Sequence, residues 1–427
     1  MVSHREELDM ARTSLKGALL ALTIGAVAIL PARAEETIKL GLIEPFSGPI
    51  AAVGLDQLEF IRIAADRVNA NGGVLGKKLE IVELDNAMKA EKTTEQLRKA
   101  IDEGIRFVTQ GVGSNHALNI IQQLEKHNKR NPDKAVLYLN HSAVTTAFTN
   151  ELCSFWHFRF DANVDMKVAA ILTAMNRDKA VKNVYMLNQN YAYGKSFQEA
   201  ANKLFPERIE NAKLVGDDLM VPFGKVQDFT PFVAKLKSLN ADTVLTGNWG
   251  PDLIRFVKAT ADAGLNTQFY TIYGGLPSSI AGYGKDAGMQ VRLKQITESH
   301  ENMDQAKSAM EFAEMYKKAT GKTWYADRNR WVIEMFVAAL EKAGTDDPKA
   351  VALALEGMSI EGPLGEIVMR ASDHQIQIPM VLSEIDDKAP QTFIYNNEDY
   401  GIGFKTLDIV SKDDVSQPTT CKMNRPS

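Results

Sequence analysis

Small polar and aromatic side chains recur in a series of short loops along this sequence. The N-terminal third contains Phe46-Ser47-Gly48, Gly113-Ser114-Asn115 and His141-Ser142, and the middle third contains Asn188 to Tyr193, Gly247-Asn248-Trp249 and Tyr273-Gly274-Gly275. Hydroxyl groups and backbone N–H groups in such turns suit a carboxylate. Aromatic side chains suit an apolar body or a ring. The combination predicts a cavity for one small ligand.

Catalytic signatures do not accompany these loops. The sequence has no nucleophile elbow, no P-loop and no H-E-x-x-H pair, and Gly111 and Gly113 lack the third glycine of a dinucleotide fingerprint. The seven histidines do not have the spacing of metal ligands. Ser114, His141 and Asp161 could form a hydrolase-like triad, although nothing in their spacing requires it. We therefore expect no enzyme, no metal and no cofactor.

Composition narrows the choice of partners. The chain has 427 residues, 45% hydrophobic and 24% charged, with a formal net charge of -5. These values are those of a globular protein large enough for two or three domains. The negative balance, without a basic stripe interleaved with aromatic residues, argues against a nucleic-acid partner.

The N-terminus has the pattern of a secretory signal peptide. Arg12 and Lys16 precede the apolar run GALLALTIGAVAIL, and Ala32-Arg33-Ala34 is a small-x-small cleavage site. We assign residues 1–34 to the signal peptide and expect a periplasmic protein. Met1 or Met10 could be the true start.

Export from the cytoplasm affects the oxidation state expected for the two cysteines. Cys153 and Cys421 are the only ones in the chain, and exported proteins fold in an oxidising compartment. We predict that they form a disulfide.

Strand and helix patterns alternate through most of the chain. Ile38 to Ile43 reads as a buried strand, ended by the turn around Ser47, and a helix follows Gly54. Ser47 and the N–H groups after Gly48 are thereby placed to hold a polar or anionic group. An ordinary loop without a ligand is the alternative for this turn.

The same alternation continues in two successive α/β units. The predicted strands are 78–84, 107–109, 135–139, 181–187, 212–219, 242–246 and 268–272, and the predicted helices include 166–175, one from about 196, 229–239 and 252–264. The last third predicts helices over 306–319, 327–343 and 348–358, strands over 365–370 and 379–385, and a surface tail over 412–427. Strands about 25 to 30 residues apart, each followed by a helix, indicate parallel sheets with right-handed crossovers.

Five segments of the sequence carry a resemblance to a known family. They are IKLGLIEPFSGPIAAVG, VNANGGVLGKKLEIVELDN, YAYGKSF, ATADAGLNTQF and EGPLGEI. The chain resembles the periplasmic solute-binding proteins of branched-chain amino-acid ABC transporters, the leucine/isoleucine/valine-binding family. The resemblance implies a type I fold of two Rossmann-like lobes joined by a three-crossover hinge. It also implies delivery of the ligand to an inner-membrane ABC permease, without catalysis. We expect a monomer.

The resemblance also implies a division of the chain and a set of ligand contacts. The lobes would comprise residues 35–158 with 285–372, and 159–284 with 373–427. The family's carboxylate-binding serine corresponds to Ser114, and the polar residue after the fourth strand to Ser142 or Ala143. The tyrosine of the Tyr-Gly turn corresponds to Tyr193, and an aromatic position to Trp249. With the loop analysis, the expected ligand-binding residues are Ser47, Ser114, Asn115, Ser142, Tyr193, Trp249 and Tyr273.

Two departures bear on the ligand. Tyr273 stands where the amino-acid binders have an acid for the ligand ammonium, and Val53 stands where they have a tyrosine. An unpaired buried ammonium would cost several kcal/mol, so we expect an aromatic or short aliphatic carboxylate. An amino acid stays possible if Asp161, Asp165 or Glu44 supplies the charge. A ligand-sensing receptor domain and a hydrolase-like enzyme are the functional alternatives.

Overall fold

The computed structural model describes residues 36–220, 224–303, 307–323 and 326–426. The predicted signal peptide, residues 1–34, lies outside these ranges, as do both candidate start residues. Among the residues described, no helix has both the length and the apolar character needed to cross a membrane.

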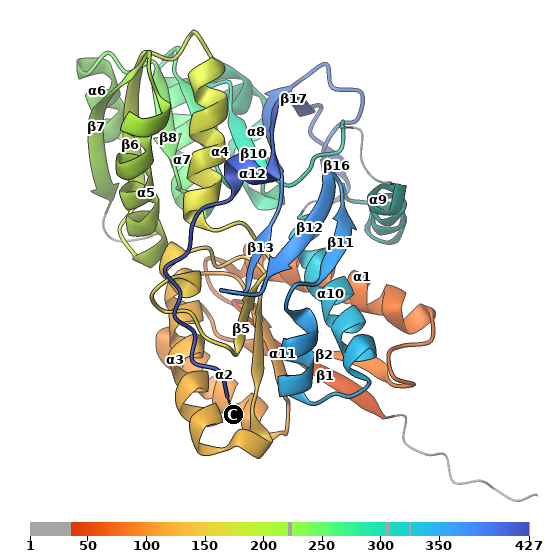
Figure 1. Ribbon diagram of the computed structural model, residues 1–427. Helices are drawn as coiled ribbons and strands as arrows, with labels where there is room; N and C mark the ends of the chain where they lie inside the picture. Colours follow the sequence, from red (N-terminus) through yellow and green to blue (C-terminus); the bar gives the residue numbers. More distant parts are fainter. Residues whose placement is uncertain (1–35, 221–223, 304–306, 324–325, 427) are drawn as a thin grey trace, which may run out of the picture. The chain divides into compact units, whose positions relative to one another are not determined.

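The first sheet is eight-stranded and mostly parallel (Figure 1). Its strands in spatial order are β11 (Ser359–Gly362), β12 (Gly365–Arg370), β13 (Gln375–Gln377), β5 (His157–Arg159), β4 (Leu137–Asn140), β3 (Phe107–Gln110), β1 (Thr37–Glu44) and β2 (Lys78–Asp85). The strands from β13 to β2 pair in parallel, whereas β11 and β12 are antiparallel additions at one edge.

The second sheet is seven-stranded and repeats this plan. Its order is β17 (Gly403–Val410), β14 (Met380–Asp386), β10 (Lys294–Thr297), β9 (Gln268–Thr271), β8 (Thr243–Thr246), β6 (Asn183–Gln189) and β7 (Lys213–Met220). The parallel part runs β7-β6-β8-β9-β10, which matches β2-β1-β3-β4-β5 of the first sheet. This agreement confirms the predicted architecture of two Rossmann-like α/β lobes.

Helices follow the parallel strands in both lobes. The first lobe has α1 (Ala51–Ala70), α2 (Ala90–Asp102), α3 (Ser114–Arg130), α9 (Lys307–Thr320), α10 (Asp327–Ala343) and α11 (Pro348–Leu355), with the short turns η1 (Pro132–Lys134) and η2 (Thr146–Thr149). The second has α4 (Val164–Arg177), α5 (Ala192–Arg208), α6 (Thr230–Ser238), α7 (Gly250–Asp262), α8 (Pro277–Gln290) and α12 (Lys412–Val415), and a hairpin of β15 (Ile394–Tyr395) and β16 (Glu398–Asp399).

Burial on both faces explains why the parallel strands read as continuous apolar runs. In β1, Leu42 packs in one apolar cluster with residues of α1 and α10. Its neighbour Ile43 points the other way, into a cluster with residues of α2 and α3. A strand covered by helices on both sides has no solvent face on which polar residues could alternate.

The chain passes between the two sheets after β5, after β10 and after β13. These three passages are the predicted hinge, but two boundaries of the predicted lobes need correction. β10 lies within 285–372, which we expected in the first lobe, yet it pairs with β9 and β14 of the second sheet. β13 lies within 373–427, yet it pairs with β5 of the first sheet. The first sheet gains β11, β12 and β13 only after the chain has passed through the second lobe, so each sheet joins strands from separate parts of the chain.

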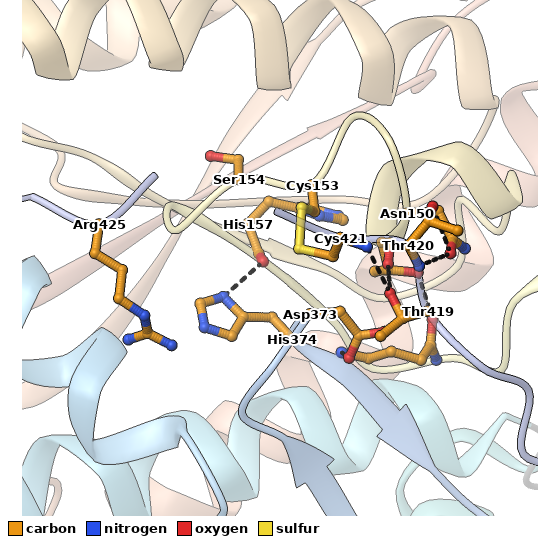
Figure 2. Close-up of a disulfide and its surroundings, with 12 residues drawn as sticks. Asn150, Cys153, Ser154, His157, Asp373, His374, Thr419, Thr420, Cys421 and Arg425 are labelled. Carbon is orange, nitrogen blue, oxygen red and sulfur yellow. Dashed lines mark hydrogen bonds between the residues drawn. A yellow bond between two sulfur atoms is a disulfide. The ribbon is translucent and has the colours of Figure 1, made fainter. Parts of the chain in front are cut away.

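The C-terminal tail makes a further return to the first lobe, which the predicted division also missed. In Figure 1 the tail runs from α12 alongside the first lobe to the end marked C. The predicted disulfide is present, with the Cα atoms of Cys153 and Cys421 5.7 Å apart. The Thr419 hydroxyl donates to the Thr149 carbonyl at 2.9 Å. Figure 2 shows a neighbouring contact, in which the Thr420 N–H donates to Asn150 Oδ1 at 2.9 Å.

Candidate functional site

A cavity lies where the carboxyl ends of the parallel strands of both sheets meet. It has about 430 Å³ of unfilled space, part of it open to solvent. The residues that line it are Val53, Gln57, Gly111, Val112, Gly113, Ser114, Ser142, Ala143, Val144, Tyr191, Tyr193, Trp249, Tyr273, Leu276 and Arg328. Ligands of open α/β sheets bind at this end of the strands.

The first-lobe wall is built around the start of α3. Gly113 precedes the helix with φ of 93°, a left-handed conformation that favours glycine. Ser114, the first helical residue, is 2% exposed and faces the cavity. The helix N-terminus carries partial positive charge, so this wall suits an anionic group.

A buried carboxylate shapes the loop before that helix. Glu44 Oε1 accepts hydrogen bonds from the N–H groups of Gly111 at 2.6 Å and Val112 at 3.1 Å. His141 Nε2 lies 3.1 Å from the same oxygen, and His141 Nδ1 lies 2.9 Å from Thr109 Oγ1. Glu44 and His141 are therefore engaged in holding the wall, and neither lines the cavity.

The second-lobe wall is aromatic. Tyr191 and Tyr193 follow β6, Trp249 follows β8 and Tyr273 follows β9. The Trp249 indole N–H donates to the Tyr191 hydroxyl at 2.7 Å, and the ring centroids of Tyr193 and Tyr273 are 6.0 Å apart. The Tyr193 side chain is 2% exposed, and its hydroxyl has no hydrogen-bond partner among the described residues. Burial raises the pKa of Tyr193, so the hydroxyl keeps its proton and can donate to a ligand.

Four buried charged groups gather where the hinge segments meet the cavity. Lys167 Nζ lies 2.7 Å from Asp161 Oδ1, and Arg328 Nη1 lies 2.9 Å from Glu298 Oε1. Arg328 Nε is also 3.6 Å from Asp161 Oδ2. Burial raises the pKa of Asp161, although Lys167 and Arg328 act in the opposite direction. Burial would also raise the pKa of Glu298, but the nearby Arg328 and Lys167 hold it below its usual value.

Five of the seven expected ligand-binding residues line the cavity: Ser114, Ser142, Tyr193, Trp249 and Tyr273. Ser47 and Asn115 are exposed and lie outside the lining. Ser47 lies instead beside Asp85, and its hydrogen bond is one of the influences that hold the pKa of that carboxyl below its usual value, against the effect of burial. The hydrolase-like set is not assembled, because His141 contacts Glu44 while Asp161 contacts Lys167.

Sequence reasoning missed several lining residues, chiefly Arg328 and Gln57. Arg328 lies in the first turn of α10, far along the chain from the loops that it contacts. Gln57 lies on α1, where its Oε1 accepts from the Asn329 side chain at 2.7 Å. The sequence offers no local signal for either, because both reach the cavity through the packing of α1 and α10.

A two-lobed α/β protein with a cavity between its sheets has the architecture of the binding proteins that enclose a small solute between two lobes. The family model described as periplasmic binding protein matches residues 37–390. The chain belongs to this family, whose members are extracytoplasmic.

Known relatives cover nearly all of the chain. A Leu/Ile/Val-binding protein homolog 4 of Brucella abortus is 32% identical over 404 residues, covering 92% of this chain and 94% of the relative. The closed structure of a leucine-, isoleucine-, valine-, threonine- and alanine-binding protein of Brucella ovis has a TM-score of 0.82 at 31% identity, covering 92% of this chain and 100% of that one. A solute-binding protein of R. palustris in complex with benzoate shares the fold, with a TM-score of 0.73 at 19% identity, covering 90% of this chain and 99% of that one.

Proposed function

We propose that this protein, after removal of its signal peptide, is the periplasmic solute-binding component of an ABC importer. It captures a small carboxylate between its lobes and delivers it, chemically unchanged, to an inner-membrane permease. It works as a monomer without a cofactor. The family membership and the position of the cavity at the strand ends of both sheets support this function.

One observation carries the choice of ligand class. Among the described residues that line the cavity, Arg328 is the only charged side chain, and none is an acid. A carboxylate would find the start of α3, the Ser114 hydroxyl and a nearby guanidinium. An ammonium would meet no lining carboxylate, and burying an unpaired charge costs several kcal/mol.

The carboxylates that could have supplied that charge have other partners. Asp165 Oδ1 accepts from the Thr146 hydroxyl at 2.6 Å, and Glu44 holds the Gly111 and Val112 N–H groups. Asp161 comes nearest, because its Oδ2 lies 3.4 Å from the Tyr273 hydroxyl. Tyr273 lines the cavity and Asp161 does not, so the acid would act on a ligand ammonium through the Tyr273 hydroxyl.

An amino acid is the second candidate, favoured by the relatives. Those at 31% and 32% identity are named for leucine, isoleucine and valine. In that case the ammonium would donate to the Tyr273 hydroxyl, with Asp161 behind it.

Isothermal titration calorimetry of the mature protein with benzoate, leucine and valine distinguishes the two. We expect benzoate to bind and the amino acids to bind at least about tenfold more weakly, a difference of 1.4 kcal/mol. Tight leucine binding would overturn the carboxylate assignment and leave the importer function standing. Chromatography of the ligand after prolonged incubation should return it unaltered, whereas turnover would point to an enzyme.

A further inference from the structure

The Ser142 hydroxyl is oriented by a buried arginine. Arg328 Nε donates to Ser142 Oγ at 2.8 Å. A serine oxygen that accepts from a guanidinium directs its own O–H elsewhere, and Ser142 lines the cavity. The Ser142 carbonyl accepts from the Tyr273 hydroxyl at 3.3 Å, so the backbone of this residue is also held between the lobes.

Arg328 is itself fixed from several sides. Glu298 Oε1 lies 2.9 Å from its Nη1 and 3.3 Å from its backbone N–H. Asp161 is 3.6 Å from its Nε. The guanidinium carbon lies 5.8 Å from the centre of the Tyr273 ring. A planar guanidinium with partners in several directions has little freedom to rotate, and the side chain is 2% exposed.

The four charged groups of this cluster are not equivalent toward a ligand. Lys167, Asp161 and Glu298 lie behind the wall, whereas Arg328 lines the cavity. The cluster is neutral in sum but presents its positive member to the ligand. A ligand group next to Ser142 therefore meets a hydroxyl donor backed by a cation.

We propose that Arg328 is a specificity-determining residue that acts through Ser142. By fixing the Ser142 hydroxyl as a donor, it makes this end of the cavity select an oxygen acceptor, such as a carboxylate or a second acceptor group of the ligand, and reject an ammonium. The inference rests on the proposed function, because it takes this cavity as the ligand site.

The test uses two probes that differ only in the ammonium, 4-methylpentanoate and leucine, titrated by calorimetry against the mature protein. Replacing Arg328 alone would leave Glu298 unpaired and buried, which is strongly destabilising. The informative variant is therefore R328Q with E298Q, alongside R328K and S142A. Thermal unfolding of each variant checks that it folds.

We expect the wild type to favour 4-methylpentanoate and the R328Q/E298Q double variant to lose about tenfold or more of that preference, the usual weight of a hydrogen bond to a charged group. S142A should lose a similar part of the preference for 4-methylpentanoate over leucine. R328K should restore some of the preference, because it keeps the charge but not the forked geometry.

A matched control separates specificity from structure. K294Q together with E384Q removes a largely buried ion pair of the second sheet, in which Lys294 Nζ lies 3.0 Å from Glu384 Oε1, and leaves the bond between Arg328 and Ser142, because neither residue lines the cavity. It is expected to lower thermal stability without changing the ratio of the two affinities. Equal weakening of both probes in the R328Q/E298Q variant would overturn the inference while ligand binding itself still supports the proposed function. Preference of the wild type for leucine would also overturn it.

Discussion

At the scale of single residues, Asp56 is an unusual buried acid close to the cavity. It lies on α1 beside Gln57, and its Oδ1 accepts from the Tyr395 hydroxyl at 2.9 Å. Burial raises the pKa of Asp56 from 3.8 to about 7, with Glu59 adding to the rise and Tyr395 and Lys322 opposing it. The contact joins α1 of the first lobe to the β15–β16 hairpin, which belongs to the excursion between β14 and β17 of the second sheet.

The raised pKa of Asp56 predicts a pH-dependent stability. Between about pH 4 and pH 7 the native state binds this proton and the unfolded state does not, so the free energy of unfolding falls as the pH rises through that window. Ionising the buried Asp56 lowers the free energy of unfolding by on the order of 4 kcal/mol. This loss is complete above pH 7. Asp56→Asn keeps an oxygen acceptor for Tyr395 and removes the titration. We expect its stability advantage, measured by urea unfolding, to grow from pH 4 to pH 7 and then level off.

The difference between variant and wild type is the quantity to measure, because other groups titrate in the same range. Burial lowers the pKa of His116 and of His300 to about 4, which makes stability rise with pH between about 4 and 6.5. Leu55→Gln, an exposed change on the same helix that involves no titrating group, is the control and should give a flat difference. A flat difference for Asp56→Asn as well would contradict the prediction.

At the scale of elements, a regular hydrophobic pattern is enough to predict long buried helices and strands. Short polar elements lack such a pattern and escape prediction. The helix predicted over 327–343 and the strand predicted over 365–370 have the observed bounds of α10 and β12. The sequence predicts neither a helix nor a strand over the segment that contains α8 (Pro277–Gln290) and β10. β10 has the sequence KQIT, and its Lys294 is buried because Nζ bonds Gln268 at 2.9 Å and Glu384 at 3.0 Å. Such partners come from distant strands and leave no periodic signal.

The disulfide that ties the C-terminal tail to the first lobe should contribute measurably to the free energy of unfolding. Cys153 and Cys421 enclose a separation of 268 residues, and closing so long a loop in the unfolded chain stabilises the native state by at most roughly 5 kcal/mol. We expect C153S/C421S to lower the free energy of unfolding by part of that amount, while the hydrogen bonds of Thr419 and Thr420 keep the tail in place. Urea unfolding with and without reductant measures it. Reductant should shift the wild type toward the variant and leave the variant unchanged, and coincident curves for oxidised wild type and variant would refute the prediction.

At the scale of the whole molecule, the sequence could predict most of the loops that form the cavity, the Ser47 turn excepted, but not how the lobes complete it. Each predicted loop follows a parallel strand, so its place at one edge of the sheet follows from topology. The charged cluster of Asp161, Lys167, Glu298 and Arg328 has no such rule behind it. Its members come from two hinge segments and two helices, and only the packed structure brings them together. The lobe boundaries failed for the same reason, since β10 and β13 are assigned by their pairing partners.

A cavity with walls from both lobes predicts that the ligand draws the lobes together. A ligand that touches Ser114 on one wall and Trp249 on the other is bound fully only when the walls face each other, so binding favours the closed arrangement. Saturating benzoate should decrease the radius of gyration in small-angle scattering and raise the melting temperature with ligand concentration. Trp249→Ala removes part of the second wall and should weaken binding by at least about tenfold, with a smaller change in radius. Ser47→Ala, on an exposed turn outside the cavity lining, should change neither the affinity for benzoate nor the decrease in radius of gyration. An unchanged radius in the wild type at saturation, or equal weakening by Ser47→Ala, would show that the ligand does not bridge the two walls.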